Sequence, residues 1–167
     1  MTRAAKRILF VLSFVFCLGF AGYLVQGSNL QAPSSGTWVP TPGPMAEART
    51  GAASAALPDG RVLVSGGTGA SGALASAELF YPDGSFYPAA PMLAARSGHT
   101  AVALKDGRVL VAGGVDAGES PTSSAEVYDP SANSWSPAAA MLLPRSGHTA
   151  TLLSDGRVLV AGGETGG

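Results

Sequence analysis

The chain has 167 residues, of which 23 are Gly and 12 are Pro, and only 13% are charged. So many helix-breaking residues and so few charges exclude a coiled coil or a helical bundle, while the 46% of apolar residues is too high for a disordered chain. The formal charge of −1 excludes nucleic-acid binding by electrostatic attraction. The composition therefore favours short strands joined by many turns.

Residues 1–27 have the pattern of an export segment. Arg3, Lys6 and Arg7 lie in a stretch without acids, and the uncharged apolar run at 8–25 predicts a helix. Two alternatives follow: a signal peptide that is cleaved, or a signal-anchor transmembrane helix that contacts the membrane through residues 8–25. In both cases the remainder is exported across the inner membrane; it is secreted or periplasmic after cleavage, and otherwise anchored with the folded part outside.

The only cysteine, Cys17, lies inside the apolar run. Phe16 precedes it where a lipidated cysteine requires a small residue, so a lipoprotein is not expected. The exported part then contains neither a disulfide nor a zinc–thiolate site. Residues 28–35, rich in Ser and Pro, are predicted to be a tether.

One ten-residue phrase occurs three times. It reads PDGRVLVSGG at 58–67, KDGRVLVAGG at 105–114 and SDGRVLVAGG at 154–163. A second phrase precedes each copy and contains Arg49, Arg96 or Arg145 with a short, mainly apolar segment after it. A third phrase, which begins Ser-Ala-Glu, follows the first two copies. Such self-similarity at intervals of 47 and 49 residues indicates a repeat architecture.

Each unit is predicted to contain four short strands. The turn-forming pair Asp106-Gly107 favours a tight hairpin, and the continuous Val-Leu-Val run after it indicates a strand buried on both faces. In the second unit the strands are expected at 98–104, 108–112 and 125–128, and around Trp135.

This pattern resembles the kelch repeat, in which an apolar strand ends in Gly-Gly and is followed by an aromatic residue and then a Trp. The matching positions are the glycine pairs at 66–67, 113–114 and 162–163, the aromatics Phe80 and Tyr128, and Trp38, Phe86 and Trp135. Two positions differ conservatively from the pattern: Phe80 stands in place of Tyr, and Phe86 stands in place of Trp. The resemblance covers residues 36–167 and implies an all-β fold, a kelch-type β-propeller of the galactose-oxidase-like superfamily with one four-stranded blade per repeat.

The repeats divide the chain after the tether into four parts. Residues 36–48 are expected to form a lone outer strand, 49–95 blade 1, 96–144 blade 2, and 145–167 the first half of a third blade. Propellers contain about four to eight blades. About two complete blades plus partial blades therefore predict a piece of a larger propeller.

Several polar residues recur with the repeat. His99 and His148 share one position, where the first unit has Ala52, and we expect them to be structural side chains hydrogen-bonded to the backbone rather than metal ligands. The recurring Arg49, Arg96 and Arg145, together with Glu78 and Glu126, either bind an anionic ligand or form buried ion pairs. We favour the ion pairs, which place Arg96 within ion-pair distance of Glu126 or Glu78.

The other charged residues do not assemble a reactive site. Arg61, Arg108 and Arg157 follow the Asp-Gly turns and are expected to be exposed. Asp116 and Glu119 are two carboxylates without the spaced third that a calcium site needs. We therefore predict no catalytic, cofactor-binding or metal-ligating residue, and no cofactor.

The leading hypothesis is a non-catalytic scaffold that binds a protein or carbohydrate ligand through the blade loops. The alternative is part of a propeller enzyme, either a galactose-oxidase-like copper oxidase or a sialic-acid-type sugar isomerase, whose active-site residues lie outside this chain. The resemblance implies that the copper enzyme needs a crosslinked Tyr and Cys. No cysteine follows residue 27, so such a site cannot be built from this chain alone.

Overall fold

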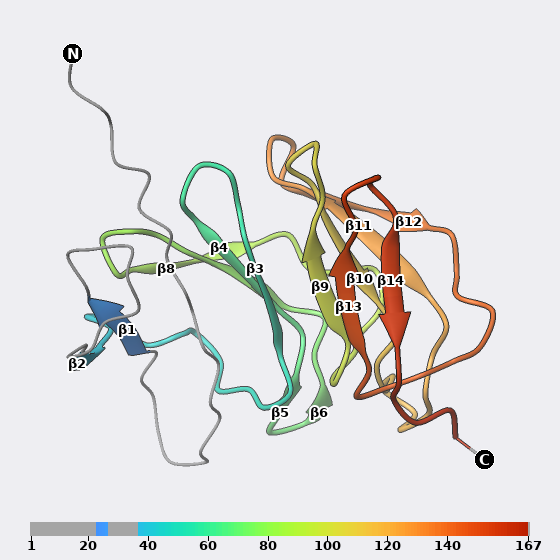
Figure 1. Cartoon of the computed structure of the whole chain (residues 1–167). Helices are drawn as coiled ribbons and strands as arrows, with labels where there is room; N and C mark the ends of the chain where they lie inside the picture. Colours follow the sequence, from blue (N-terminus) through green and yellow to red (C-terminus); the bar gives the residue numbers. More distant parts are fainter. Residues whose placement is uncertain (1–22, 27–36, 167) are drawn as a thin grey trace.

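The computed structural model describes residues 23–26 and 37–166 (Figure 1). Most of the expected apolar helix at 8–25 and the tether at 28–35 lie outside these ranges. The end of the apolar run, β1 (Tyr23–Gln26), pairs antiparallel with β2 (Thr37–Pro40), the strand expected within 36–48. The described ranges contain strands and no helix, so they hold no helical membrane span.

Blade 1 is a four-stranded antiparallel sheet in the order β3-β4-β7-β8. Its strands are β3 (Ala53–Ala56), β4 (Val62–Ser65), β7 (Ala77–Phe80) and β8 (Phe86–Ala89). The connection from β4 to β7 contains a small hairpin of β5 (Thr68–Gly69) and β6 (Gly72–Ala73).

Blade 2 repeats this arrangement. Its order is β12-β11-β10-β9, and its strands are β9 (Thr100–Ala103), β10 (Val109–Ala112), β11 (Ala125–Asp129) and β12 (Ser134–Ala138). The register is also repeated, because Val62 pairs with Phe80 in blade 1 as Val109 pairs with Tyr128 in blade 2. A final hairpin, β13 (Thr149–Leu152) and β14 (Val158–Ala161), forms a two-stranded sheet.

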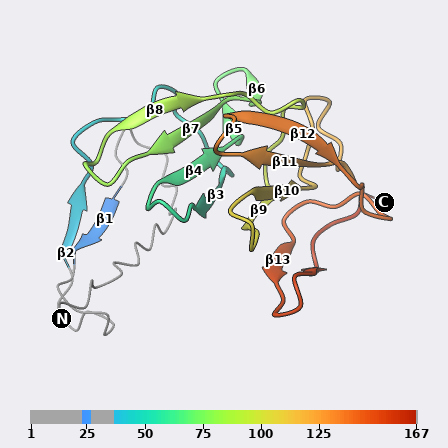
Figure 2. The same cartoon turned by 90° about the horizontal axis from the view of Figure 1, so that it is seen from above.

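The first strands of the three units lie side by side. β9 is adjacent to both β3 and β13, and Figure 2 shows β8 and β12 along the opposite, outer margin. At the start of these strands the Gly98 N–H donates to the Gly51 carbonyl at 2.8 Å, and the Gly147 N–H donates to the Gly98 carbonyl at 3.0 Å. All three residues have φ between 61° and 63°, a left-handed conformation that favours glycine. These bonds form a glycine ladder that joins successive units.

The core lies between the blades. Leu63 of blade 1 and Val109, Val111 and Tyr128 of blade 2 are each 0% exposed and belong to one apolar cluster. Burial of both faces of the Val-Leu-Val strands is confirmed in part, because Leu110 is only half-buried. In β14 no residue is buried.

Blade 2 is fastened to blade 1 by hydrogen bonds to Ala90. Trp135 Nε1 donates to the Ala90 carbonyl at 2.7 Å, and Asn133 Oδ1 accepts from the Ala90 N–H at 2.9 Å. Asn133 has φ of 45°, and its Oδ1 also accepts from the Tyr128 hydroxyl at 2.8 Å. Gly84 and Phe86 stand at the equivalent positions in blade 1, and neither side chain can form these bonds.

Candidate binding sites at the two ends of the blades

The recurring Arg and Glu residues form a buried ion pair in each complete blade. Arg49 Nη2 lies 2.8 Å from Glu78 Oε1, and Arg96 Nη2 lies 2.7 Å from Glu126 Oε1. All four side chains are at most 4% exposed. The predicted pairing of Arg96 with Glu126 is confirmed, and these charges serve the fold rather than a surface for anionic ligands.

Backbone groups supply further hydrogen bonds to each pair, although the Nε atoms of Arg49 and Arg96 are buried without a partner. Arg96 Nη1 donates to the carbonyls of Gly113 at 2.9 Å and Ser124 at 3.1 Å. The Glu126 carboxylate accepts from the N–H groups of Leu93 at 2.7 Å and Ala94 at 3.1 Å. These bonds offset the cost of burying the two charges, and they tie the segment before β9 to β10 and β11.

The two histidines link successive units. His99 Nε2 lies 3.1 Å from Ser65 Oγ of β4, and His148 Nε2 lies 3.0 Å from Thr100 Oγ1 of β9. Both residues are 6% exposed. Each ring thus faces across the boundary to a hydroxyl of the preceding unit. His148 also has the expected hydrogen bond to the backbone, at Ala112. The sequence does mark Ser65 as an exception, because the other two units have Ala at the equivalent position.

Burial of His99 makes stability depend on pH. Desolvation, with a smaller contribution from the nearby Arg96 charge, lowers the His99 pKa from 6.5 to about 3. Between these values the unfolded chain binds more protons than the folded one. We therefore expect the free energy of unfolding to be highest above pH 6.5 and to fall as the pH decreases toward 3, losing about 2 kcal/mol by pH 5.

Urea titrations at pH 7.5 and pH 5.0 measure this effect. His99→Gln, which does not titrate in this range, should show the smaller decrease in unfolding free energy between the two conditions. Equal decreases in the two proteins would contradict the assignment to His99.

The Asp-Gly turns carry short-range salt bridges at the surface. In each turn an arginine lies 2.7 Å from the aspartate two residues before it; the pairs are Asp59–Arg61, Asp106–Arg108 and Asp155–Arg157. Arg108 and Arg157 are 49% and 80% exposed, as predicted. Arg61 is only 21% exposed because its guanidinium carbon lies 5.6 Å from the Tyr81 ring centre. Hydrogen bonding to the arginines lowers the pKa of all three aspartates.

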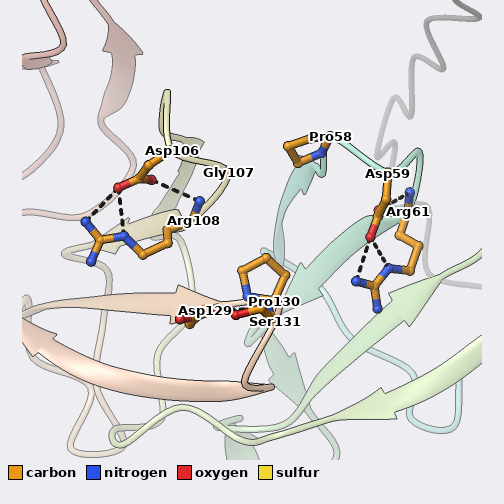
Figure 3. A pocket seen from close by; sticks show the side chains of 9 residues that line it. All are labelled: Pro58, Asp59, Arg61, Asp106, Gly107, Arg108, Asp129, Pro130 and Ser131. Atoms are coloured by element: carbon orange, nitrogen blue, oxygen red, sulfur yellow. Dashed lines mark hydrogen bonds and ion pairs between the residues drawn. The ribbon is translucent and has the colours of Figure 1, made fainter.

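Three turns surround a cavity of about 420 Å³ at one end of the blades, here called the turn pocket (Figure 3). It lies between the Asp-Gly turns of blades 1 and 2 and the turn from Asp129 to Ser131. Asp129 Oδ1 accepts from the Ser131 N–H at 2.8 Å and from its hydroxyl at 2.6 Å. Because Arg61 and Arg108 bond to the aspartates of their own turns, the charged groups here mainly stabilise the turns.

A second cavity, of about 400 Å³, lies at the opposite end and is here called the loop pocket. It is formed by the connections that follow β4 and β10, which differ most between the two blades. The hydroxyls of Thr68, Ser71 and Ser97 line it together with the carboxylates of Asp116 and Glu119, and no basic residue is among its lining residues. The loop pocket is therefore acidic.

The two carboxylates of the loop pocket have different environments. Asp116 Oδ1 accepts from the N–H groups of Gly118 at 2.8 Å and Ser120 at 3.1 Å, which closes the loop. Glu119 is exposed and has φ of 60°, which is uncommon outside glycine. Across residues 23–26 and 37–166, no three His, Cys, Asp or Glu side chains are placed to hold a metal ion.

Comparison with known families identifies one segment. Residues 95–142, which include all of blade 2, match the family model described as the Kelch motif. No curated protein matches the chain. This match and the four-stranded antiparallel blades fit a piece of a kelch-repeat propeller.

Proposed function

We propose that this kelch-repeat chain is an exported, non-catalytic propeller scaffold that binds a basic segment of a partner protein in the loop pocket. The observation that carries the proposal is the contrast between two ends of one scaffold. The turn pocket is built from repeated turns whose charges are paired within each turn, whereas the loop pocket combines hydroxyls with an exposed carboxylate.

The scaffold can hold the loop pocket in place without help from a ligand. The loops leave β4 and β10 directly after glycines whose carbonyls accept from Arg49 and Arg96 at 2.9 Å. An isolated bridge between Ser97 and Val115 joins the loop of blade 2 to the start of its first strand. Rigid strands that carry variable loops are the usual arrangement of a recognition surface.

Charge indicates the chemistry of the partner. Asp116 and Glu119 give the pocket a negative potential, so a lysine or arginine side chain is its natural complement. The surrounding hydroxyls can accept further hydrogen bonds from an ammonium or guanidinium group. Since such contacts are partly exposed, binding should weaken as the salt concentration rises.

Export is supported by the sequence alone. The basic residues Arg3, Lys6 and Arg7 precede the apolar run at 8–25, the order that an export signal requires. Cell fractionation combined with the intact mass of the product tests this part. A full-length cytosolic protein would contradict it.

A peptide-display selection against the full chain tests the binding function. Selected peptides should be enriched in Lys and Arg, and Glu119→Asn should weaken their binding about tenfold, which corresponds to one lost charge-assisted hydrogen bond. Asn tolerates the left-handed backbone at this position, so the variant removes the charge and retains the loop. Ser131→Ala, in the turn pocket, is the matched control and should bind normally.

Three results would overturn the proposal. Selected peptides that bind Glu119→Asn as well as the wild type would place recognition elsewhere. Retention of glycans without peptides on parallel arrays would make the ligand a carbohydrate. Stoichiometric copper with peroxide production from a sugar would show an enzyme.

A further inference from the structure

Blade 1 carries two tyrosines that have no counterpart in blade 2. Tyr87 of β8 is 52% exposed, and its ring centre lies 5.1 Å from that of Tyr81 in an edge-to-face arrangement. The last two strands of blade 2 pair in the same register, and there Ser136 takes the place of Tyr87 and Asp129 that of Tyr81. A blade of this architecture therefore forms without either aromatic ring.

Tyr87 is exposed at a place where two complete blades meet. It pairs with Leu79 across the sheet, so the two side chains lie on the same face. Leu79 is 5% exposed and belongs to the apolar cluster between the blades, against which Tyr81 also packs. Blade 2 thus covers the inner part of this face and leaves Tyr87, on the outer strand β8, open to solvent (Figure 2). An exposed tyrosine ring presents an apolar surface with a polar tip.

Arg61 connects the two tyrosines to the turn pocket. Its guanidinium carbon lies 5.6 Å from the Tyr81 ring centre, and Arg61 lines the turn pocket together with Pro58 and Pro130. Figure 3 shows these two proline rings between the salt-bridged turns of the two blades. The tyrosine pair therefore continues the wall of the pocket outward along the boundary between the blades. The turn pocket with Tyr81 and Tyr87 is here called the seam site.

The charges of the turn pocket favour a neutral ligand. Arg61 and Arg108 are bonded to the aspartates of their own turns, which weakens their attraction for an anion, and both would repel a cation that approached Asp129. Within the part of the chain that the structure describes, Arg108 Nη1 and Asp129 Oδ2 form no hydrogen bond. One donor and one acceptor are therefore left for a ligand, and a hydroxyl group can serve both.

We propose that the seam site binds a neutral, β-1,4-linked glycan. In such a chain the hydroxyls lie around the rim of each pyranose ring, and C–H groups form its two faces. One sugar stacks a C–H face on the exposed ring of Tyr87. Its neighbour occupies the turn pocket, where Arg108 donates to its hydroxyls and Asp129 accepts from them. The volume of about 420 Å³ lies within the range of small-molecule sites. The seam site is separate from the loop pocket, so either proposal can fail alone.

Isothermal titration calorimetry of the full chain with cellohexaose and with the β-1,4-linked hexamer of N-acetylglucosamine tests the seam site. At least one of the two sugars should bind saturably, and added salt should leave its affinity unchanged because it carries no charge. Tyr87→Ser should weaken binding about tenfold, since the stacking surface is lost, and Ser136 shows that a blade accommodates serine there. Tyr87→Phe keeps the ring and should bind nearly as the wild type does.

Two further variants separate the seam site from other surfaces. Asp129→Asn keeps the Oδ1 atom that closes the turn and removes the negative charge, so it should also weaken sugar binding about tenfold. Leu93→Ser is the matched control, because it removes a different apolar side chain that is 62% exposed, and it should bind the sugars as the wild type does.

Three results would overturn the proposal. The first is the absence of saturable binding of both sugars. The second is equal binding by Tyr87→Ser and the wild type, which would place the sugar elsewhere. The third is binding of a polyproline decapeptide, but of neither sugar, that Tyr87→Ser abolishes, because the ligand would then be a protein segment.

Discussion

Replacing Arg96 by Met should lower the free energy of unfolding by about 3–5 kcal/mol, the cost of leaving one partner of a buried ion pair without its counter-charge. Arg96 and Glu126 are respectively 0% and 4% exposed, so water cannot take over the role of the guanidinium without opening the blade. The substitution also removes donors from the carbonyls of Gly113 and Ser124. Equilibrium unfolding in guanidinium chloride measures the loss.

Two comparisons separate burial from charge. Arg108→Met removes an exposed salt bridge and should cost less than about 1 kcal/mol. The double variant Arg96→Met/Glu126→Leu should be more stable than Arg96→Met alone, because it also removes the buried carboxylate. If the double variant is less stable than Arg96→Met, the unpaired Glu126 carboxylate is not the main reason why Arg96→Met is destabilised.

Substitution of Gly113, the glycine that follows β10, should lower the free energy of unfolding almost as much as substitution of Arg96 does. Gly113 has φ of 66°, and a Cβ there would lie 2.5 Å from the Arg145 carbonyl oxygen and 2.7 Å from His148 Cε1. That carbonyl accepts from the Gly114 N–H at 2.8 Å, so the clash falls on a bond between blade 2 and the third unit. We expect Gly113→Ala to cost about 3 kcal/mol, the sum of left-handed strain and overpacking.

Gly162→Ala provides the matched control within the same chain. Gly162 follows β14 with φ of 73°, and apart from its two chain neighbours no described residue has an atom within 4 Å of a Cβ placed there. Gly162→Ala should therefore lower the free energy of unfolding only by the strain of the left-handed backbone, about 1 kcal/mol. Thermal unfolding of both variants gives the comparison, and similar losses would show that the steric contact at Gly113 is relieved cheaply.

The sequence predicts the repeated features of the structure well. Three copies of one phrase place the hairpin turns, and a residue type that recurs with the repeat, such as Arg96 with Glu126, indicates a contact that recurs with it. The four-stranded blades and the buried ion pairs follow from this regularity, and the structure confirms both.

What the sequence does not predict are features that occur only once. Ser65 accompanies a histidine of the next unit, and Asn133 adopts a positive φ to reach Ala90; neither residue recurs in the other unit. The loop pocket depends on how two dissimilar loops approach each other, which no local pattern encodes. The pairing of Tyr23–Gln26 with β2 joins the end of an apolar run to a strand beyond the tether, a long-range choice of the same kind.

The glycine ladder has an evolutionary consequence. Each rung runs in one direction, from the N–H of one unit to the carbonyl of the unit before it, through Gly51, Gly98 and Gly147. Every unit thus presents an acceptor to its successor and a donor to its predecessor, whatever its rank in the series. Duplication or deletion of one whole repeat period leaves donor and acceptor matched at the new junction. A change in chain length by one repeat is therefore compatible with an unbroken glycine ladder.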